Sequence, residues 1–137
     1  MDLSSTFFDT DKFVNTNKKL GKGSFGEVYV VKDKVENIEY AAKIIDTQKV
    51  FSGQDQMMFL RESLILHTLN HPAIVKFYGI NLLEFNNATI LHPTILTEYL
   101  ENGALKQILD NEKKSIADDN WNCTKKFICL LGISDAL

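Results

Sequence analysis

The pattern of apolar and polar residues in the first third of the chain predicts three successive strands, at residues 13–20, 27–33 and 39–45. The second segment, EVYVVKD, is rich in β-branched and aromatic residues, which favour a strand over a helix. Residues 34–37 are expected to form the turn between the second and third strands, because Asn37 tolerates a positive φ. These segments therefore predict a continuous series of hairpins.

The pattern becomes helical at residues 56–69, where five residues recur at helical spacing: Met58, Glu62, Ile65, Leu66 and Leu69. The helix is expected to end at Asn70-His71-Pro72, because proline cannot continue the backbone ladder and restricts the residue before it. Glu62 shares a face with Met58, Ile65 and Leu66, so we expect it to point at the sheet. A carboxylate in that position requires a positive partner.

Two more strands are predicted downstream, at residues 73–80 and 89–99, with a turn at residues 86–87. The last strand is interrupted by His92-Pro93 and is most regular over residues 94–99. A flexible joint at residues 101–103 precedes a short helix at 104–109, a charged connector at 110–120 and a helix at 121–137. Five strands and one long helix predict a small α+β domain, and residues 1–11 are either a frayed tail or a segment packed on the sheet.

A glycine run lies at the tip of the first predicted hairpin, with Gly21, Gly23 and Gly26 as its glycines. Glycine lacks a Cβ, so the backbone amides of such a tip can approach an anion closely. The same triplet occurs in dinucleotide-binding folds, where it opens a helix. Here a strand follows, and we treat the position of Asp46, 20 residues after Gly26, as a coincidence.

Lys43 stands in an otherwise apolar predicted strand, two residues after the small Ala41. A lysine in such a position is either paired with a carboxylate or a solvated charge on an edge strand. Glu62 is the candidate partner for the first alternative.

Composition and charge narrow the function classes. A net charge of -3 with a pI near 5.6 and scattered lysines argues against nucleic acid and anionic membrane surfaces as partners. No apolar run approaches the length of a membrane helix and no signal peptide is present, so a soluble, cytoplasmic protein is expected. Cys123 and Cys129 cannot form a metal site by themselves and are expected to be reduced thiols, buried or half-buried.

Four correctly spaced motifs together resemble the N-terminal lobe of the eukaryotic protein kinases. They are Gly21, Gly23, Gly26 and Val28 as GxGxxGxV; Ala41 with Lys43; Glu62, 19 residues further on; and the turn at residues 71–75. The segment from Leu96 to Leu105 is most similar to tyrosine kinase-like serine/threonine kinases and to tyrosine kinases. The resemblance implies a five-stranded antiparallel sheet with one helix and a hinge at residues 12–100, followed at 101–137 by the start of a helical C-terminal lobe.

The resemblance also implies an ATP site. Lys43 would hold the α- and β-phosphates, and Glu62 would form the ion pair that orients Lys43. The glycine loop, with Lys22, Ser24 and Phe25 between its glycines, would cover the phosphates. Three apolar side chains would contact the adenine ring, namely Leu20, Val28 and Ala41. Thr97 would be the gatekeeper at the back of the pocket, and the backbone of Glu98 and Leu100 would hydrogen-bond the ring.

The catalytic-loop and DFG motifs of the family, which hold the catalytic base and Mg²⁺, do not occur in these 137 residues. We therefore expect the chain to be inactive alone, to hold no metal itself, and to be a fragment of a kinase whose full-length form uses Mg²⁺ and phosphorylates protein hydroxyls. Serine/threonine and tyrosine specificity both remain open. The alternative is a truncated or pseudokinase-like module without catalysis, and an exposed apolar surface on the last helix predicts self-association.

Overall fold

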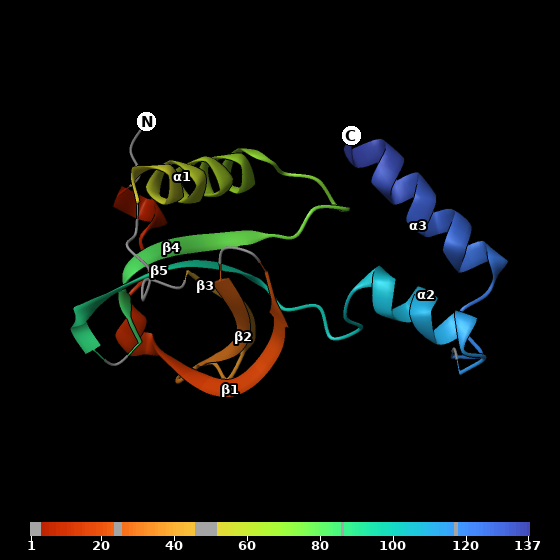
Figure 1. The fold of residues 1–137 in the computed structure, drawn as a ribbon, viewed down its shortest axis with the longest axis horizontal. Coiled ribbons are helices and arrows are strands. Elements are labelled where there is room, and N and C mark those ends of the chain that lie inside the picture. Colours follow the sequence, from red (N-terminus) through yellow and green to blue (C-terminus); the bar gives the residue numbers. More distant parts are fainter. Residues whose placement is uncertain (1–3, 24–25, 46–51, 86, 117) are drawn as a thin grey trace. The chain divides into compact units, whose positions relative to one another are not determined.

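The computed structural model describes residues 4–23, 26–45, 52–85, 87–116 and 118–137 (Figure 1). The chain divides into two compact units. The first comprises Met1–Leu69 and Val75–Tyr99, and the second comprises Asn70–Ile74 and Leu100–Leu137.

A five-stranded antiparallel sheet forms the first unit, as the sequence predicts. Its strands are β1 (Phe13–Lys22), β2 (Gly26–Asp33), β3 (Glu39–Ile45), β4 (Phe77–Glu84) and β5 (Asn87–Glu98). Their order in the sheet is β1-β2-β3-β5-β4, which places β3 in the centre. The turn between β2 and β3 contains Asn37 at φ 59°, so the predicted positive φ is confirmed.

Two details of the predicted strands are wrong, one a boundary and the other an interruption. The fourth strand begins at Phe77 and not at residue 73, because residues 71–74 form a turn in which the His71 ring accepts a hydrogen bond from the Ala73 amide. The fifth strand runs through His92-Pro93 without interruption. An irregularity in the β4–β5 register lies at this point, so Pro93 occupies a place where the ladder does not require its missing N–H.

One long helix, α1 (Gly53–Thr68), belongs to the same unit and begins three residues earlier than predicted. Ser52 and Asp55 form a capping box at its start, which satisfies backbone N–H groups that would otherwise lack partners. The buried face of α1 carries Phe59 and Ser63, with Leu66 packed beside them. Met58 and Ile65 are 45% and 47% exposed, so the predicted apolar face was wrong by about one residue.

The core consists of two clusters. Phe13, Val31, Ala42, Phe85 and Leu96 form one cluster, and Ile45, Phe59, Ile80 and Ile95 form the other, which includes α1. Alternate residues of a strand point to opposite faces, so Ala42 and Leu96 lie on one face of the sheet and Ile45 and Ile95 lie on the other.

The N-terminal segment packs on the sheet, which decides between the two alternatives that the sequence left open. Phe7 forms a parallel bridge with Ile80 of the edge strand β4, and the Phe8 amide donates to the Ile80 carbonyl at 3.1 Å. The Phe8 carbonyl in turn accepts from Asn81 Nδ2 at 2.5 Å. Gly79 permits this close approach, because a Cβ there would lie 2.5 Å from the Thr6 carbonyl oxygen.

The second unit contains α2 (Leu105–Lys113) and α3 (Cys123–Ala136). Because α2 extends to Lys113, it includes the first part of the predicted charged connector. Glu112 accepts hydrogen bonds from Trp121 Nε1 at 3.2 Å and from Lys126 Nζ, so it ties α2 to the start of α3. Cys129 is half-buried as expected, whereas Cys123 is exposed, because it is the first residue of α3.

Candidate functional site

The register of the sheet places four of the predicted site residues on one face. Val28 of β2 lies directly opposite Lys43 of β3, and Ala41 lies opposite Thr97 of β5. Directly opposed residues of antiparallel strands project to the same face, and residues two apart in one strand do so as well. Val28, Ala41, Lys43 and Thr97 therefore share the face that also carries Ile45, which packs with Phe59 of α1.

Lys43 and Glu62 meet on this face. Lys43 Nζ donates to both carboxylate oxygens of Glu62 at 2.7 Å. The side chains are 29% and 40% exposed, so the pair is accessible from solvent and not sealed in the core. Since β3 is the central strand, the alternative interpretation of Lys43 as an edge-strand charge is wrong.

The β1–β2 hairpin carries the glycine run. The Gly23 amide donates to the Gly26 carbonyl at 2.8 Å and closes the hairpin near its tip. Gly21 lies opposite Val28, and a Cβ on Gly21 would meet no atom of the described residues within 4 Å, so its described surroundings are open. Ser24 and Phe25, which we predicted to cover phosphates, lie outside the described residues.

Leu20 and Lys22 are the two other predicted site residues of this hairpin, and both lie in the last part of β1. Leu20 is the extra residue of a bulge between the Lys19–Tyr29 and Gly21–Val28 pairs, and it is 42% exposed. Lys22 lies opposite Glu27, with its ammonium nitrogen 3.5 Å from Glu27 Oε1. Because Glu27 is adjacent to Val28 in β2, the structure directs the Lys22 side chain to the opposite face from Lys43.

The end of β5 supplies the remaining predicted positions. The Glu98 amide donates to the Lys76 carbonyl at 2.9 Å, and Glu98 Oε1 accepts from the Lys76 amide at 2.6 Å. These two bonds fix the backbone of β5 just after Thr97. Leu100 is the first residue of the second unit's C-terminal stretch and is 53% exposed.

The hydrophobic residues that connect α1 to the sheet were predicted in part. Leu66 and Phe77 pack against the cluster of Ile45, Phe59, Ile80 and Ile95, as expected. Phe59 and Ser63 were missed. Ser63 is buried because its hydroxyl donates to the Phe59 carbonyl at 2.7 Å, a bond within the helix that hydrophobic periodicity does not reveal.

The sheet, the helix and the lysine–glutamate pair together define the amino-terminal lobe of a kinase domain. The protein kinase domain family matches residues 14–130, and the chain therefore belongs to the protein kinase family. Among the described helices, none combines the length with the apolar composition that a membrane span requires.

Three relatives illustrate the similarity. The spermatocyte protein spe-8 of Caenorhabditis elegans is 34% identical over 113 residues, covering 77% of this chain and 20% of the relative. The Aurora kinase of Saccharomyces cerevisiae is 36% identical over 92 residues, covering 67% of this chain and 23% of the relative. The mouse serine/threonine-protein kinase TNNI3K is 33% identical over 113 residues, covering 82% of this chain and 13% of the relative. The chain thus spans less than a quarter of the length of each of these relatives.

Proposed function

We propose that this chain is the ATP-binding part of a protein kinase. The observation that carries the proposal is the Lys43–Glu62 ion pair on the sheet face that carries Val28 and Ala41. An ammonium group has three N–H donors, and the Glu62 carboxylate holds Lys43 in place while leaving it part-exposed. We assign to Lys43 the α- and β-phosphates and to Glu62 the orientation of Lys43.

The glycine hairpin would cover the phosphates with its backbone amides. The open surroundings of Gly21 fit this role, because no atom of the described residues would lie within 4 Å of a Cβ at that position. We assign the phosphate-facing contacts to the backbone of residues 21–26 and do not assign one to the Lys22 ammonium, which is directed to Glu27.

The purine would lie against the same sheet face. Val28 and Ala41 are half-buried there and offer small apolar surfaces, and Leu20 is the third apolar side chain that we assign to the ring. Thr97 lies opposite Ala41, so we place it at the back of the site. The backbone of Glu98 and Leu100 would hydrogen-bond the adenine edge, which leaves the identity of their side chains unconstrained.

Protein kinases use ATP and Mg²⁺, and ATP supplies the phosphoryl group that they transfer. The catalytic-loop aspartate and the DFG aspartate have no counterpart in the 137 residues, so the residues present fit the nucleotide but not the metal. We propose that this chain binds nucleotide without transferring phosphate. A longer protein that contains it would phosphorylate serine, threonine or tyrosine hydroxyls of protein substrates.

A nucleotide titration tests the proposal. The full chain should bind ATP, and Lys43→Met should weaken the affinity about ten-fold or more, because a charge-assisted hydrogen bond to phosphate is lost. Lys106→Met, which removes an exposed lysine of α2, is the matched control and should bind as the wild type does. Equal affinity of the wild type and Lys43→Met would contradict the assigned role of Lys43.

Absence of any ATP signal from folded wild-type chain would overturn the proposal and favour the non-catalytic alternative, a module that binds a partner through its surface. Exposed apolar side chains on α3 support the related proposal that copies of this chain associate with one another. A phosphotransfer assay with a general protein substrate completes the test, since measurable turnover by the 137-residue chain would contradict its proposed catalytic incompleteness.

A further inference from the structure

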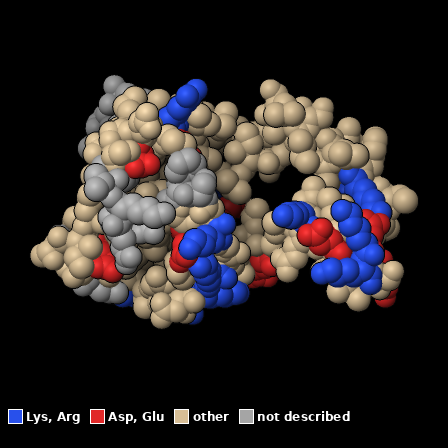
Figure 2. All heavy atoms as spheres, viewed as in Figure 1, with Lys and Arg blue, Asp and Glu red and all other residues tan. Residues whose placement is uncertain are grey.

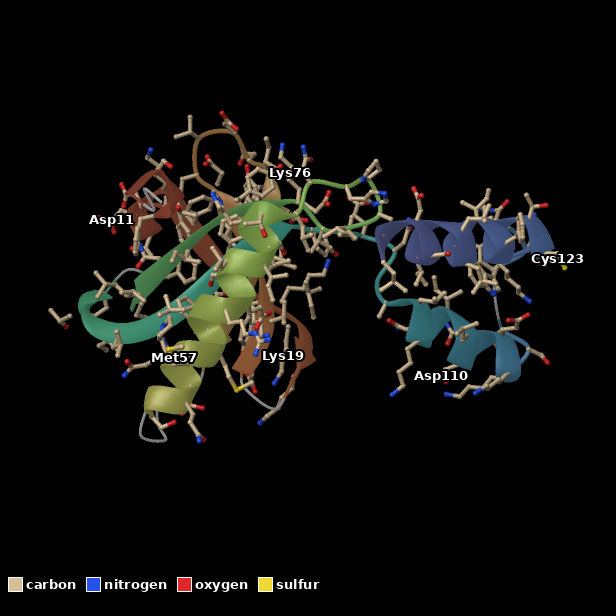
Figure 3. All side chains as sticks on the ribbon, turned by 90° about the horizontal axis from the view of Figure 1, so that it is seen from above. Asp11, Lys19, Met57, Lys76, Asp110 and Cys123 are labelled. Atoms are coloured by element: carbon tan, nitrogen blue, oxygen red, sulfur yellow. The ribbon has the colours of Figure 1, made fainter. Side chains whose placement is uncertain are left out.

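A charged cluster lies on the β1–β2 hairpin and converges on the carboxylate of Glu27. Glu27 Oε1 accepts from Lys19 Nζ at 2.6 Å and lies 3.5 Å from Lys22 Nζ. Glu27 Oε2 accepts from the Tyr29 hydroxyl at 2.5 Å. Figure 2 shows lysine side chains gathered over this hairpin with acidic side chains beside them, and Figure 3 shows Lys19 on the same hairpin.

The cluster lies on the far side of the hairpin from the proposed nucleotide site. Glu27 and Tyr29 flank Val28 in β2, so their side chains point to the opposite face from Val28 and Lys43. The Glu27 side chain is 27% exposed. A ligand held against Val28 and Lys43 would therefore not touch the Glu27 carboxylate, and any effect of Glu27 on that ligand must pass through the backbone.

The cluster spans the irregular part of β1. Lys19 pairs with Tyr29 before the bulge at Leu20, and Lys22 pairs with Glu27 after it. Glu27 thus holds β1 on both sides of the bulge, next to the Gly23–Gly26 hydrogen bond that closes the hairpin. A bulge bends its strand and leaves the ladder locally disrupted, so side-chain bonds across it restrict the hairpin to fewer conformations.

We propose that Glu27 is a positioning residue, which through Lys19, Lys22 and Tyr29 fixes the glycine hairpin in the conformation that receives phosphate. This inference rests on the proposed ATP binding. A preordered hairpin loses less conformational freedom when a ligand binds, and this raises affinity without a contact to the ligand. The effect is confined to the part of the nucleotide that the hairpin covers, namely the phosphates.

The electrostatics of the cluster keep Glu27 and Lys19 ionised at neutral pH. The hydrogen bonds from Lys19 and then Tyr29 lower the pKa of Glu27 from 4.5 to about 2. The same contact with Glu27 raises the pKa of Lys19 and the pKa of Tyr29. Because its pKa is depressed, the ionised Glu27 carboxylate stabilises the folded form above pH 4.5, and this stabilisation is lost as the pH falls toward 2. The Glu27 carboxylate is therefore fully ionised at neutral pH.

The test compares ATP with adenosine. Glu27→Gln in the full chain should weaken ATP binding about three- to ten-fold and leave adenosine binding unchanged, since only ATP carries the phosphates that the hairpin covers. Lys19→Met should lower the affinity for ATP relative to that for adenosine, as Glu27→Gln does. The double variant Lys19→Met with Glu27→Gln should change this ratio little more than either single substitution. Glu36→Gln, an exposed glutamate of the β2–β3 turn, is the matched control and should match the wild type. A general loss of stability would lower both affinities together.

Hydrogen exchange of the Gly23 amide gives a readout without nucleotide. Glu27→Gln should speed this exchange several-fold and leave the amides of β4 and β5 unchanged. Failure of the wild type to bind ATP would remove the proposed function. Wild-type ATP binding, together with an unchanged ATP-to-adenosine ratio and unchanged Gly23 exchange in Glu27→Gln and Lys19→Met, would overturn the positioning role alone.

Discussion

Two glycines of the β1–β2 hairpin, Gly21 and Gly26, serve different physical purposes. A Cβ on Gly26 would overlap the Ile44 carbonyl oxygen and lie 3.0 Å from Ile45 Cα, because β2 and β3 are close together at this point. A Cβ on Gly21 would meet nothing within 4 Å in the part of the chain that the structure describes. The glycine at position 26 therefore serves the packing of the sheet, whereas the glycine at position 21 leaves space for a ligand.

Gly26→Ala should consequently lower the free energy of unfolding by about 2 kcal/mol or more, because the added methyl group meets backbone that cannot rotate away. Gly21→Ala should change it by less than about 0.5 kcal/mol, as for other substitutions at open positions. Urea denaturation of the two variants and the wild type measures the difference. A wild-type midpoint for Gly26→Ala would show that the sheet can open at Ile44 without cost.

At the scale of the elements, the sequence predicted what strong periodicity and charge can reveal. The strand at residues 39–45 was predicted with its observed bounds. The Lys43–Glu62 pair was predicted because Lys43 lies in an otherwise apolar strand and Glu62 lies among apolar residues on one side of the helix. The same rule misplaced the buried face of α1, because Ser63 counts as polar although its hydroxyl bonds within the helix. Periodicity measures the polarity of a residue and not whether its polar group has a partner.

The other misses arise from backbone irregularities. Residues 73–80 are mostly apolar, which favours a strand, but the ring of His71 stabilises a turn at residues 71–74. This interaction depends on conformation rather than on the pattern of the sequence. The Glu27 cluster could not be predicted either. Its residues look like ordinary surface charges, and only the bulge at Leu20 brings Lys19 and Lys22 to the same carboxylate.

The start of α1 depends on two side chains that cap each other's backbone. Ser52 accepts a hydrogen bond from the Asp55 amide, and Asp55 accepts from the Ser52 amide, so each satisfies the other's backbone. Ser52→Ala should therefore lower the free energy of unfolding by about 1 kcal/mol. Ser134→Ala, at an exposed site in α3, should have a smaller effect, and thermal unfolding of both variants provides the comparison. Equal stabilities would show that the capping box does not stabilise α1.

At the scale of the whole molecule, the exposed apolar surface is the feature that most affects behaviour in solution. Phe127, Leu130 and Leu131 follow one another at helical spacing on α3 and are 61%, 65% and 52% exposed. A row of this kind is larger than the scattered apolar side chains of an ordinary surface. The net charge of -3 on 137 residues gives little electrostatic repulsion between copies.

We therefore expect the chain to associate as its concentration rises, because contact between two such rows removes apolar surface from water. Sedimentation velocity over a concentration series measures this directly. The double variant Phe127→Gln with Leu130→Gln should move association to a concentration about ten-fold higher or more, since burying one such side chain contributes about 1.5–3 kcal/mol. Ile116→Gln removes a single exposed side chain outside α3 and should leave the profile unchanged. If the wild type stays monomeric at every concentration, or if the control shifts association as far as the double variant does, the α3 row is not the surface through which copies meet.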